Sequence, residues 1–249
     1  MKKHFLFLYL TFFFLPCNSI FSKDIKVLLL VIASDNRPIF KELQKIWTSY
    51  MYSDPEHIEV YFIKGDPKLP VEYSFQENVL WTKTKEGYIP GVINKTIVAM
   101  EAILPKIKDF DYIIRTNLST FFIFPRLLTF LETCPPKGVY GGFEIKKYGI
   151  VNGSCILMSP DIVEKLVQNK HFFLDNTSAI DDRLIGFFLK DKEIPIYPIN
   201  RLDILTIDTW NKVKNNLPTD IFHLRIKSVD NLRLIDDINI HSQLIKMFY

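Results

Sequence analysis

The sequence has few of the features that mark disordered, nucleic-acid-binding or phosphate-loop proteins. Its 249 residues include 9 glycines and 14 prolines, too few for a disordered chain. The formal charge of +3 comes from scattered lysines, without an arginine-rich stripe or a nucleic-acid-binding motif, so we expect no nucleic-acid partner. Neither a P-loop nor a G-x-G-x-x-G motif occurs. These absences indicate a folded protein outside those three classes.

Cysteine is scarce, which limits the disulfides that the protein can form. The chain has 3 cysteines, and Cys17 lies in the N-terminal segment. If that segment is removed, Cys134 and Cys155 remain as a possible disulfide in an oxidising compartment. The sequence alone does not show whether these two residues meet.

The first residues have the shape of a targeting signal. Residues 1–4 are basic, and residues 5–15 form an apolar stretch that is broken by Pro16. This stretch is shorter than the ~20 apolar residues that cross a bilayer, so we predict a signal peptide or short signal anchor over residues 1–23. It implies a secretory route, an exported or membrane-anchored protein, and membrane association through this segment. A buried first strand or helix is the alternative.

The remaining chain, residues 24–249, is predicted to form one α/β domain. With 48% hydrophobic and 24% charged residues it can bury a substantial core, and no internal repeat, low-complexity tract or linker divides it. Residues 25–33 form a continuous apolar run, which is typical of a central strand covered on both faces. A polar loop and an apolar pattern of helical spacing over residues 39–50 follow, as in many nucleotide-binding folds.

Strands and helices continue to alternate along the chain. Alternation of this kind implies a mainly parallel sheet with right-handed crossovers. Further strands are expected at residues 58–63, 78–82, 111–115 and 153–158, and helices over residues 93–104, from Ser159-Pro160 onward, and just beyond Asp181-Asp182. We expect Ser159 to cap one of these helices and residues 176–178 to cap another.

Polar side chains follow a buried strand within residues 111–122, which read DYIIRTNLSTFF. The apolar run of residues 112–114 ends in Arg115, and Asn117 and Ser119 come directly after it. Polar groups at the tip of a buried strand usually face a ligand crevice. This segment is therefore the first candidate for a binding site.

The same segment resembles the active-site strand of the β-1,3-galactosyltransferase and Fringe superfamily, which reads Y-D-F-L-L-K-T-D-D-D-V-F-V. Asn117, Leu118 and Ser119 stand where that family has three acids. Other segments resemble family motifs in the same order: SDNRPIFKELQKIW at 34–47, YFIKG at 61–65, EGYIPGVINKT at 86–96, GSC with the following MS at 153–159, and DDRLIG at 181–186, where the family has E-D-V-x-x-G.

This resemblance implies both a fold and an activity. The expected fold is a single-domain, GT-A-like (Rossmann-like) α/β structure with a mainly parallel sheet flanked by helices. The expected activity is that of an inverting glycosyltransferase, which transfers a hexose from a nucleotide sugar, with UDP the expected nucleotide, to a glycan or glycoconjugate acceptor.

Two aspartates are the candidates for proton transfer. An acceptor hydroxyl must lose a proton as it attacks, which requires an ionised carboxylate, and a helix N-terminus favours that form. The resemblance assigns the general base to Asp182, with Asp181 as its neighbour. The alternative is that both acids only stabilise the start of a helix.

Most members of this family bind the donor diphosphate through a divalent metal on the acidic motif. Asn117 and Ser119 offer only neutral oxygens, and His223 resembles the late histidine that joins the metal. We therefore expect Mn²⁺ or Mg²⁺ to be weakly held, mostly by the diphosphate itself. A packed histidine between Phe222 and Leu224 is the alternative for His223.

Cations could also neutralise the leaving group without metal, because arginine pairs with phosphate oxygens in bidentate fashion. Arg225 and Lys227 are candidates, together with Lys95 and Arg115. The residues predicted to bind the donor are Ser34, Asn36, Arg37, Lys95, Arg115, Asn117 and Ser119.

Two further residues are assigned to the acceptor side. Gly153 belongs to a segment that resembles the family, and Trp210 precedes polar residues that suggest partial exposure, whereas Trp47 and Trp81 follow core patterns. Two other functions stay open. The chain could be a degenerate relative that binds a glycan or nucleotide without chemistry, or a nucleotide-binding α/β protein unrelated to sugars.

Overall fold

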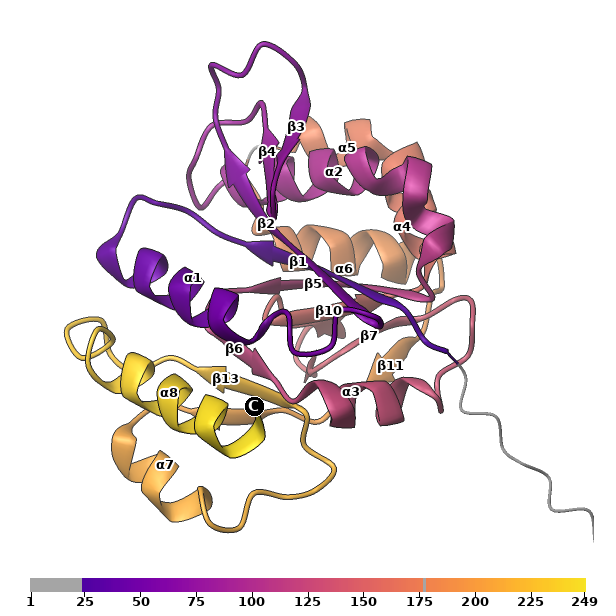
Figure 1. Ribbon diagram of the computed structural model, residues 1–249. Helices are drawn as coiled ribbons and strands as arrows, with labels where there is room; N and C mark the ends of the chain where they lie inside the picture. The colour runs from indigo at the N-terminus through magenta and orange to yellow at the C-terminus, as the bar shows by residue number, and fades with distance from the viewer. Residues whose placement is uncertain (1–23, 177) are drawn as a thin grey trace, which may run out of the picture.

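A mixed eight-stranded sheet forms the centre of the structure, a computed structural model that describes residues 24–176 and 178–249 (Figure 1). The strand order is β11 (Ile196–Pro198), β7 (Tyr140–Gly142), β10 (Cys155–Met158), β5 (Tyr112–Asn117), β1 (Val27–Ile32), β2 (Ile58–Gly65), β4 (Val79–Thr82) and β3 (Tyr73–Gln76). Parallel pairing joins β5, β1, β2 and β4 in the middle of the sheet, and β11 to β7 at one edge. The predicted α/β class with a mostly parallel sheet is confirmed.

The apolar run in β1 is buried on both faces because helices cover each side of the sheet. Val27, Leu29 and Val31 pack into the core beneath α1 (Pro38–Tyr50). Leu28 and Leu30 alternate with them and pack beneath α2 (Gly91–Ile103). A strand whose two faces are both covered has no position for a polar side chain, which explains the unbroken run of apolar letters.

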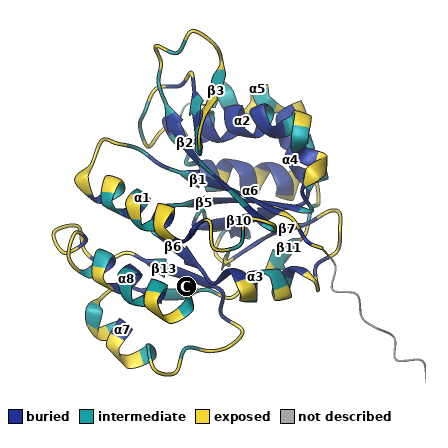
Figure 2. Ribbon diagram, in the orientation of Figure 1, coloured by how far each residue is buried: buried dark blue, intermediate teal, exposed yellow. Residues whose placement is uncertain are grey.

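The helices form two layers, and Figure 2 shows their buried sides turned toward the sheet. The layer over α2 buries its apolar side chains in one core cluster and the layer over α1 in another. The first contains α4 (Pro160–Gln168), α5 (Lys170–Leu174) and α6 (Asp181–Asp191), with the 3-10 helix η1 (Leu104–Asp109), and the second contains α3 (Phe124–Leu131), α7 (Ile207–Val213) and α8 (Asp236–Phe248).

A small second sheet brings the C-terminal part of the chain to the end of β5. Its strands are β12 (Leu202–Ile204), β13 (His223–Ile226) and β6 (Thr120–Phe122). Because β6 follows β5 after a short turn and Arg225 pairs with Thr120, the segment after β13 lies beside the turn at the tip of β5. A two-stranded ribbon, β8 (Glu144–Ile145) with β9 (Ile150–Val151), completes the fold.

The helix start predicted at Ser159-Pro160 is confirmed, but the capping hydrogen bond expected from the Ser159 hydroxyl is absent. Ser159 occupies the N-cap position of α4, but its hydroxyl donates to Asp161 Oδ1 at 2.6 Å and accepts the Val139 N–H at 2.9 Å, so it does not cap the helix. The cap predicted at residues 176–178 is also displaced, because α6 begins at Asp181 with Ile180 at its N-cap. Position 177 lies outside the described residues.

The predictions for the cysteines and the N-terminal segment have different outcomes. Cys134 and Cys155 are both buried free thiols, so the disulfide considered for them is not formed, and burial raises the pKa of Cys155 to about 12. Residues 1–23, the predicted signal, lie outside the described residues. Within the part of the chain that the structure describes, no helix has the length and apolar character needed to cross a bilayer.

Candidate functional site

A cleft of about 570 Å³ opens where the carboxyl ends of β1 and β5 meet. Its volume lies within the range of about 300–1,000 Å³ that is usual for small-molecule sites. Five segments line it: the loop and helix start after β1, the segment that leads into α2, the turn after β5, the start of α6 with the loop before β10, and the segment after β13. Ligands of open α/β sheets bind at this end of the strands.

The fold brings most of the residues singled out in the sequence into this cleft. Trp210 and His223 are the two exceptions, since neither lines it. The twelve that do are Ser34, Asn36, Arg37, Lys95, Arg115, Asn117, Ser119, Gly153, Asp181, Asp182, Arg225 and Lys227.

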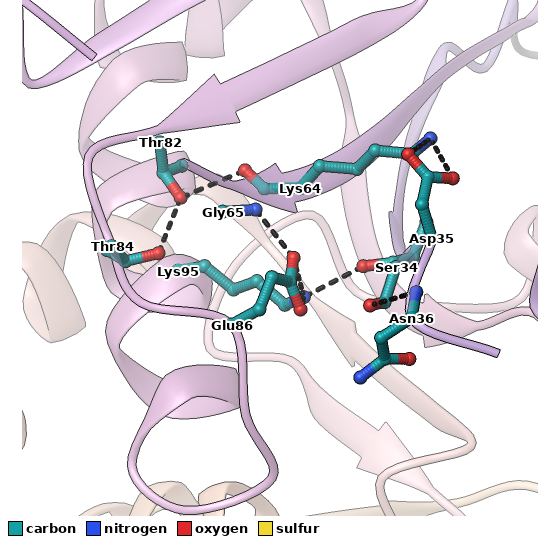
Figure 3. A network of polar contacts seen from close by, with 10 residues as sticks. Ser34, Asp35, Asn36, Lys64, Gly65, Thr82, Thr84, Glu86 and Lys95 are labelled. Carbon is teal, nitrogen blue, oxygen red and sulfur yellow. Dashed lines mark hydrogen bonds and ion pairs between the residues drawn. The ribbon is translucent and has the colours of Figure 1, made fainter. Parts of the chain in front are cut away.

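Lys95 is buried and serves as a brace between the strands and the loop before α2 (Figure 3). Its Nζ donates to the Ala33 carbonyl at the end of β1 at 2.8 Å and to both carboxylate oxygens of Glu86 at 3.0 Å. Glu86 also accepts the Gly65 N–H at the end of β2 at 2.7 Å. Burial lowers the pKa of Lys95, with the Glu86 charge opposing that effect. The positive charge of Lys95 is therefore largely neutralised by Glu86 within the protein.

The loop after β1 is held by contacts on the same side of the cleft (Figure 3). Lys64 donates to both carboxylate oxygens of Asp35, at 2.8 and 2.9 Å. The Ser34 hydroxyl accepts the Asn36 N–H at 3.3 Å. Ser34 and Asn36 thus shape the loop, and the exposed Asn36 side chain remains at the cleft wall.

Arg115 and Asp181 form a buried ion pair that ties β5 to the first turn of α6. Arg115 also donates to the Gly153 carbonyl through Nη1. Burial raises the pKa of Asp181, while the Arg115 charge opposes that rise. The guanidinium predicted to bind the donor is therefore already paired with a carboxylate.

Asp182, the next residue, faces the cleft and is only partly buried. Its Oδ2 accepts the Gly153 N–H at 3.0 Å. A Cβ added to Gly153 would lie 2.9 Å from Arg115 Nη1 and 3.3 Å from Asp182, so a larger residue here would force one of these side chains to shift. Gly153 consequently orients Asp182, which differs from the acceptor contact predicted for it.

The tip of β5 is neutral and its polar atoms are engaged locally. Asn117 Oδ1 accepts the Ser119 N–H at 3.0 Å, and its Nδ2 donates to the Gly153 carbonyl at 3.3 Å. The Ser119 hydroxyl accepts a hydrogen bond from Arg233 Nη2 at 2.8 Å. A guanidinium therefore lies beside the position where a metal-binding acid was expected.

Arg233 is a cleft residue that the sequence analysis did not identify. It is almost fully buried, and its Nε donates to Asp237 Oδ2 at 2.8 Å. Asp237 also accepts the N–H and the hydroxyl of Ser228, at 2.9 and 2.6 Å. An arginine and an aspartate four residues apart at a helix start form a local signal for such a pair. Nothing local connects that pair with Ser119, which is 114 residues away.

His223 lies in β13 and is fully buried, with its ring stacked on Phe122 at a centroid distance of 5.4 Å. Neither ring nitrogen has a hydrogen-bond partner among the described residues. Burial, reinforced by the charges of Arg201 and Arg225, lowers the pKa of His223 to about 3, so the ring is neutral. This placement matches the packed alternative. Within the described residues, no three His, Cys, Asp or Glu side chains are grouped to hold a metal ion.

Trp210 is fully buried in α7, so the partial exposure predicted for it is wrong. Its Nε1 donates to Gln243 Oε1 in α8 at 2.8 Å. The polar residues that follow it lie on the outer side of the helix, whereas the indole packs toward α8. Trp47 is also core, as predicted, and donates to the Leu118 carbonyl at 3.2 Å.

Comparison with known proteins supports the fold. No family model matches the chain, and no curated protein matches it. Among the solved structures, it is similar to a glycosyltransferase involved in the glycosylation of the major capsid of PBCV-1, with a TM-score of 0.51 and 9% sequence identity. The match covers 87% of this chain and 98% of that one. At this identity the likeness establishes the fold alone: the chain shares its overall α/β fold with that glycosyltransferase.

Proposed function

We propose that the protein is an inverting glycosyltransferase that transfers a hexose from a nucleotide sugar, with UDP as the expected nucleotide, to a glycan or glycoconjugate acceptor. The observation that carries the proposal is the position of Asp182, a partly exposed carboxylate in the first turn of α6, inside a cleft at the carboxyl ends of the strands. The shared fold and the ordered motifs point to the same chemistry.

Asp182 is the general base in this proposal. It lies in the first turn of α6, and the Gly153 N–H fixes one of its oxygens. Within the described residues the other oxygen, Oδ1, makes no hydrogen bond, so it is available to an acceptor hydroxyl. The hydroxyl oxygen bonds to the anomeric carbon as the bond to the diphosphate breaks, and its proton passes to Asp182. A single displacement of this kind inverts the anomeric configuration.

Asp181 has a different role from its neighbour because its environment differs. It is buried and paired with Arg115, whereas Asp182 is partly exposed. Adjacent carboxylates in contrasting environments divide the work of positioning and proton transfer. Asp181 anchors the start of α6 so that Asp182 reaches the cleft.

The test is release of UDP from a panel of UDP-hexoses with glycan and glycoprotein acceptors. A protein-linked glycan belongs in the panel because the similar solved enzyme is described as involved in capsid glycosylation. We expect Asp182→Asn to lose about 10²–10⁴-fold in turnover, the usual contribution of a general base. Asp208→Asn is the matched control, since Asp208 lies in the first turn of α7 and does not line the cleft. Equal release by the wild type and Asp182→Asn would remove Asp182 from the mechanism.

The neutral tip of β5 favours a second candidate, a protein that binds a nucleotide or glycan without chemistry. The same panel separates the two. Binding of UDP with no turnover on any donor and acceptor supports the second candidate. Export or membrane anchoring through residues 1–23 is a separate proposal, tested by comparing the cell fractions that hold the full chain and a chain starting at Asp24.

A further inference from the structure

The cations of the cleft fall into two groups, and in the second group all but Arg233 are loosely paired or unpaired among the described residues. Lys95 and Arg115 are buried against Glu86 and Asp181, as described above. A second group comprises Arg37, Arg225, Lys227 and Arg233, named here the basic cluster. All four line the same cavity as Asp182.

The positive charges of the basic cluster are only partly neutralised by neighbouring aspartates. Arg233 is well paired with Asp237 at 2.8 Å. Arg225 and Arg37 have looser partners, Asp203 at 3.6 Å and Asp230 at 3.5 Å. The Asp230 side chain is 72% exposed, so water screens its attraction for Arg37.

Lys227 has no ion-pair or hydrogen-bond partner for its side chain among the residues that the structure describes. Partial burial lowers its pKa, and the neighbouring charges of Arg225 and Arg233 lower it further. An ammonium crowded by other cations is stabilised when an anion enters between them. The segment after β13 therefore presents a site for negative charge.

The tip of β5 does not suit the divalent metal that the family resemblance implies. Asn117 and Ser119 are neutral, and both use their side chains in hydrogen bonds to the protein. Hard divalent cations prefer carboxylate oxygens. The guanidinium of Arg233, hydrogen-bonded to Ser119, would also repel a cation at this position.

We propose that the basic cluster holds the diphosphate of the donor directly, in place of a protein-bound metal. Arg225 and Arg37 offer paired N–H groups that match phosphate oxygens, and Lys227 adds an ammonium. When the glycosidic bond breaks, its electron pair stays on the terminal phosphate oxygen of the diphosphate. Fixed positive charges stabilise that oxygen without metal. This inference rests on the proposed function for the identity of the anion.

Inorganic pyrophosphate is the probe, since it carries the diphosphate without a base or sugar. Calorimetry in EDTA should show binding by the wild type that weakens as salt is raised. We expect Lys227→Gln to bind pyrophosphate about tenfold more weakly, the effect of losing one charge-assisted hydrogen bond. Lys212→Gln is the matched control: the same exposed residue type, the same change of charge, and a position in α7 away from the cleft. It should bind like the wild type.

A second variant guards against an effect specific to Lys227. Arg225→Gln removes a partly buried member of the same cluster and should also weaken pyrophosphate binding by about tenfold. Circular dichroism of each variant checks that it is folded, and a misfolded Arg225→Gln leaves Lys227→Gln to decide.

Three results would overturn the inference: no binding of pyrophosphate, binding only when Mn²⁺ is added, or equal affinity for the wild type and Lys227→Gln. Its failure is distinct from failure of the proposed function. Metal-free, Lys227-dependent binding without turnover on any donor retains the anion site and removes the transferase. Turnover that requires Mn²⁺ and is unchanged in Lys227→Gln retains the transferase and removes the anion site.

Discussion

The two sides of the cleft use charge in opposite ways. On the side of β1 and α2, Lys95 is buried and closely paired with Glu86, and between β5 and α6 Arg115 is paired with Asp181 in the same manner. On the side of β13, Arg225 is partly exposed and loosely paired, and Lys227 is exposed and has no ion-pair partner among the described residues. The buried pairs fix the geometry, and the loosely paired cations retain charge for a ligand. Cations in one cleft are thus not equivalent, and pairing separates the two roles.

The largest effect on stability is expected from breaking a pair on the neutralised side. Arg115→Leu leaves Asp181 buried without its partner, so we expect a loss of about 3–5 kcal/mol in the free energy of unfolding by urea. The double variant Arg115→Leu/Asp181→Asn should recover part of that loss, because it no longer buries an unpaired charge. A loss below about 1 kcal/mol in the single variant would show that the pair does not hold the framework.

His223 extends the comparison along β13, where it is buried and neutral two residues from the partly exposed Arg225. Its pKa of about 3 lies below the ordinary value of 6.5, so the unfolded chain binds the extra proton first as pH falls. Stability is therefore full above pH 6.5 and is lost between pH 6.5 and about 3, at up to about 1.4 kcal/mol per pH unit. Urea unfolding from pH 7 to pH 4.5 measures this slope.

The control for that slope is His223→Leu, which should flatten it in part. His241 is also buried, with a pKa lowered to about 4, and continues to contribute in the variant. An unchanged slope in His223→Leu would contradict a neutral, buried imidazole at this position.

A smaller effect is expected at the glycine that joins the Arg115–Asp181 pair to Asp182. Gly153→Ala places a Cβ against both Arg115 and Asp182, and overpacking of this kind costs about 1–3 kcal/mol. UDP release should fall as well, because Asp182 must shift. Gly87→Ala is the control, since an added Cβ there meets nothing within 4 Å and should leave the stability unchanged. Equal stability of both alanine variants would show that the contact is not tight.

The smallest effect on stability is expected in the basic cluster. Lys227→Gln removes an exposed charge without a partner, so its free energy of unfolding should stay within about 0.5 kcal/mol of the wild type while pyrophosphate affinity falls. Thermal unfolding measures the stability of this variant, and calorimetry measures its affinity for pyrophosphate. A clear loss of stability in this variant would show that Lys227 helps to hold the fold. The two sides of the cleft would then not differ in the role of their cations.

Local pattern predicted the parts of the fold that depend on near neighbours in the chain. The apolar run of β1, the helical spacing in α1 and the acids in the first turn of α6 were all read from a few residues each. Trp210 was misplaced for the same reason: its polar neighbours were visible in the sequence, but the α8 residue that covers it, Gln243, is 33 positions away.

By itself the sequence determined a single α/β domain, a polar tip on β5 without acids, and Asp182 at a helix start. Each of these follows from periodicity or residue type over a short window. Only the tertiary structure decided which charged side chains are paired within the protein. It paired Arg115 with Asp181, 66 positions apart, and brought Arg233 to Ser119 through the small sheet of β6 and β13. Charge pairing depends on distance in space, which no local pattern encodes. The sequence therefore named Arg37, Arg225 and Lys227 as candidates, but it showed neither how they are paired nor that Arg233 lies among them.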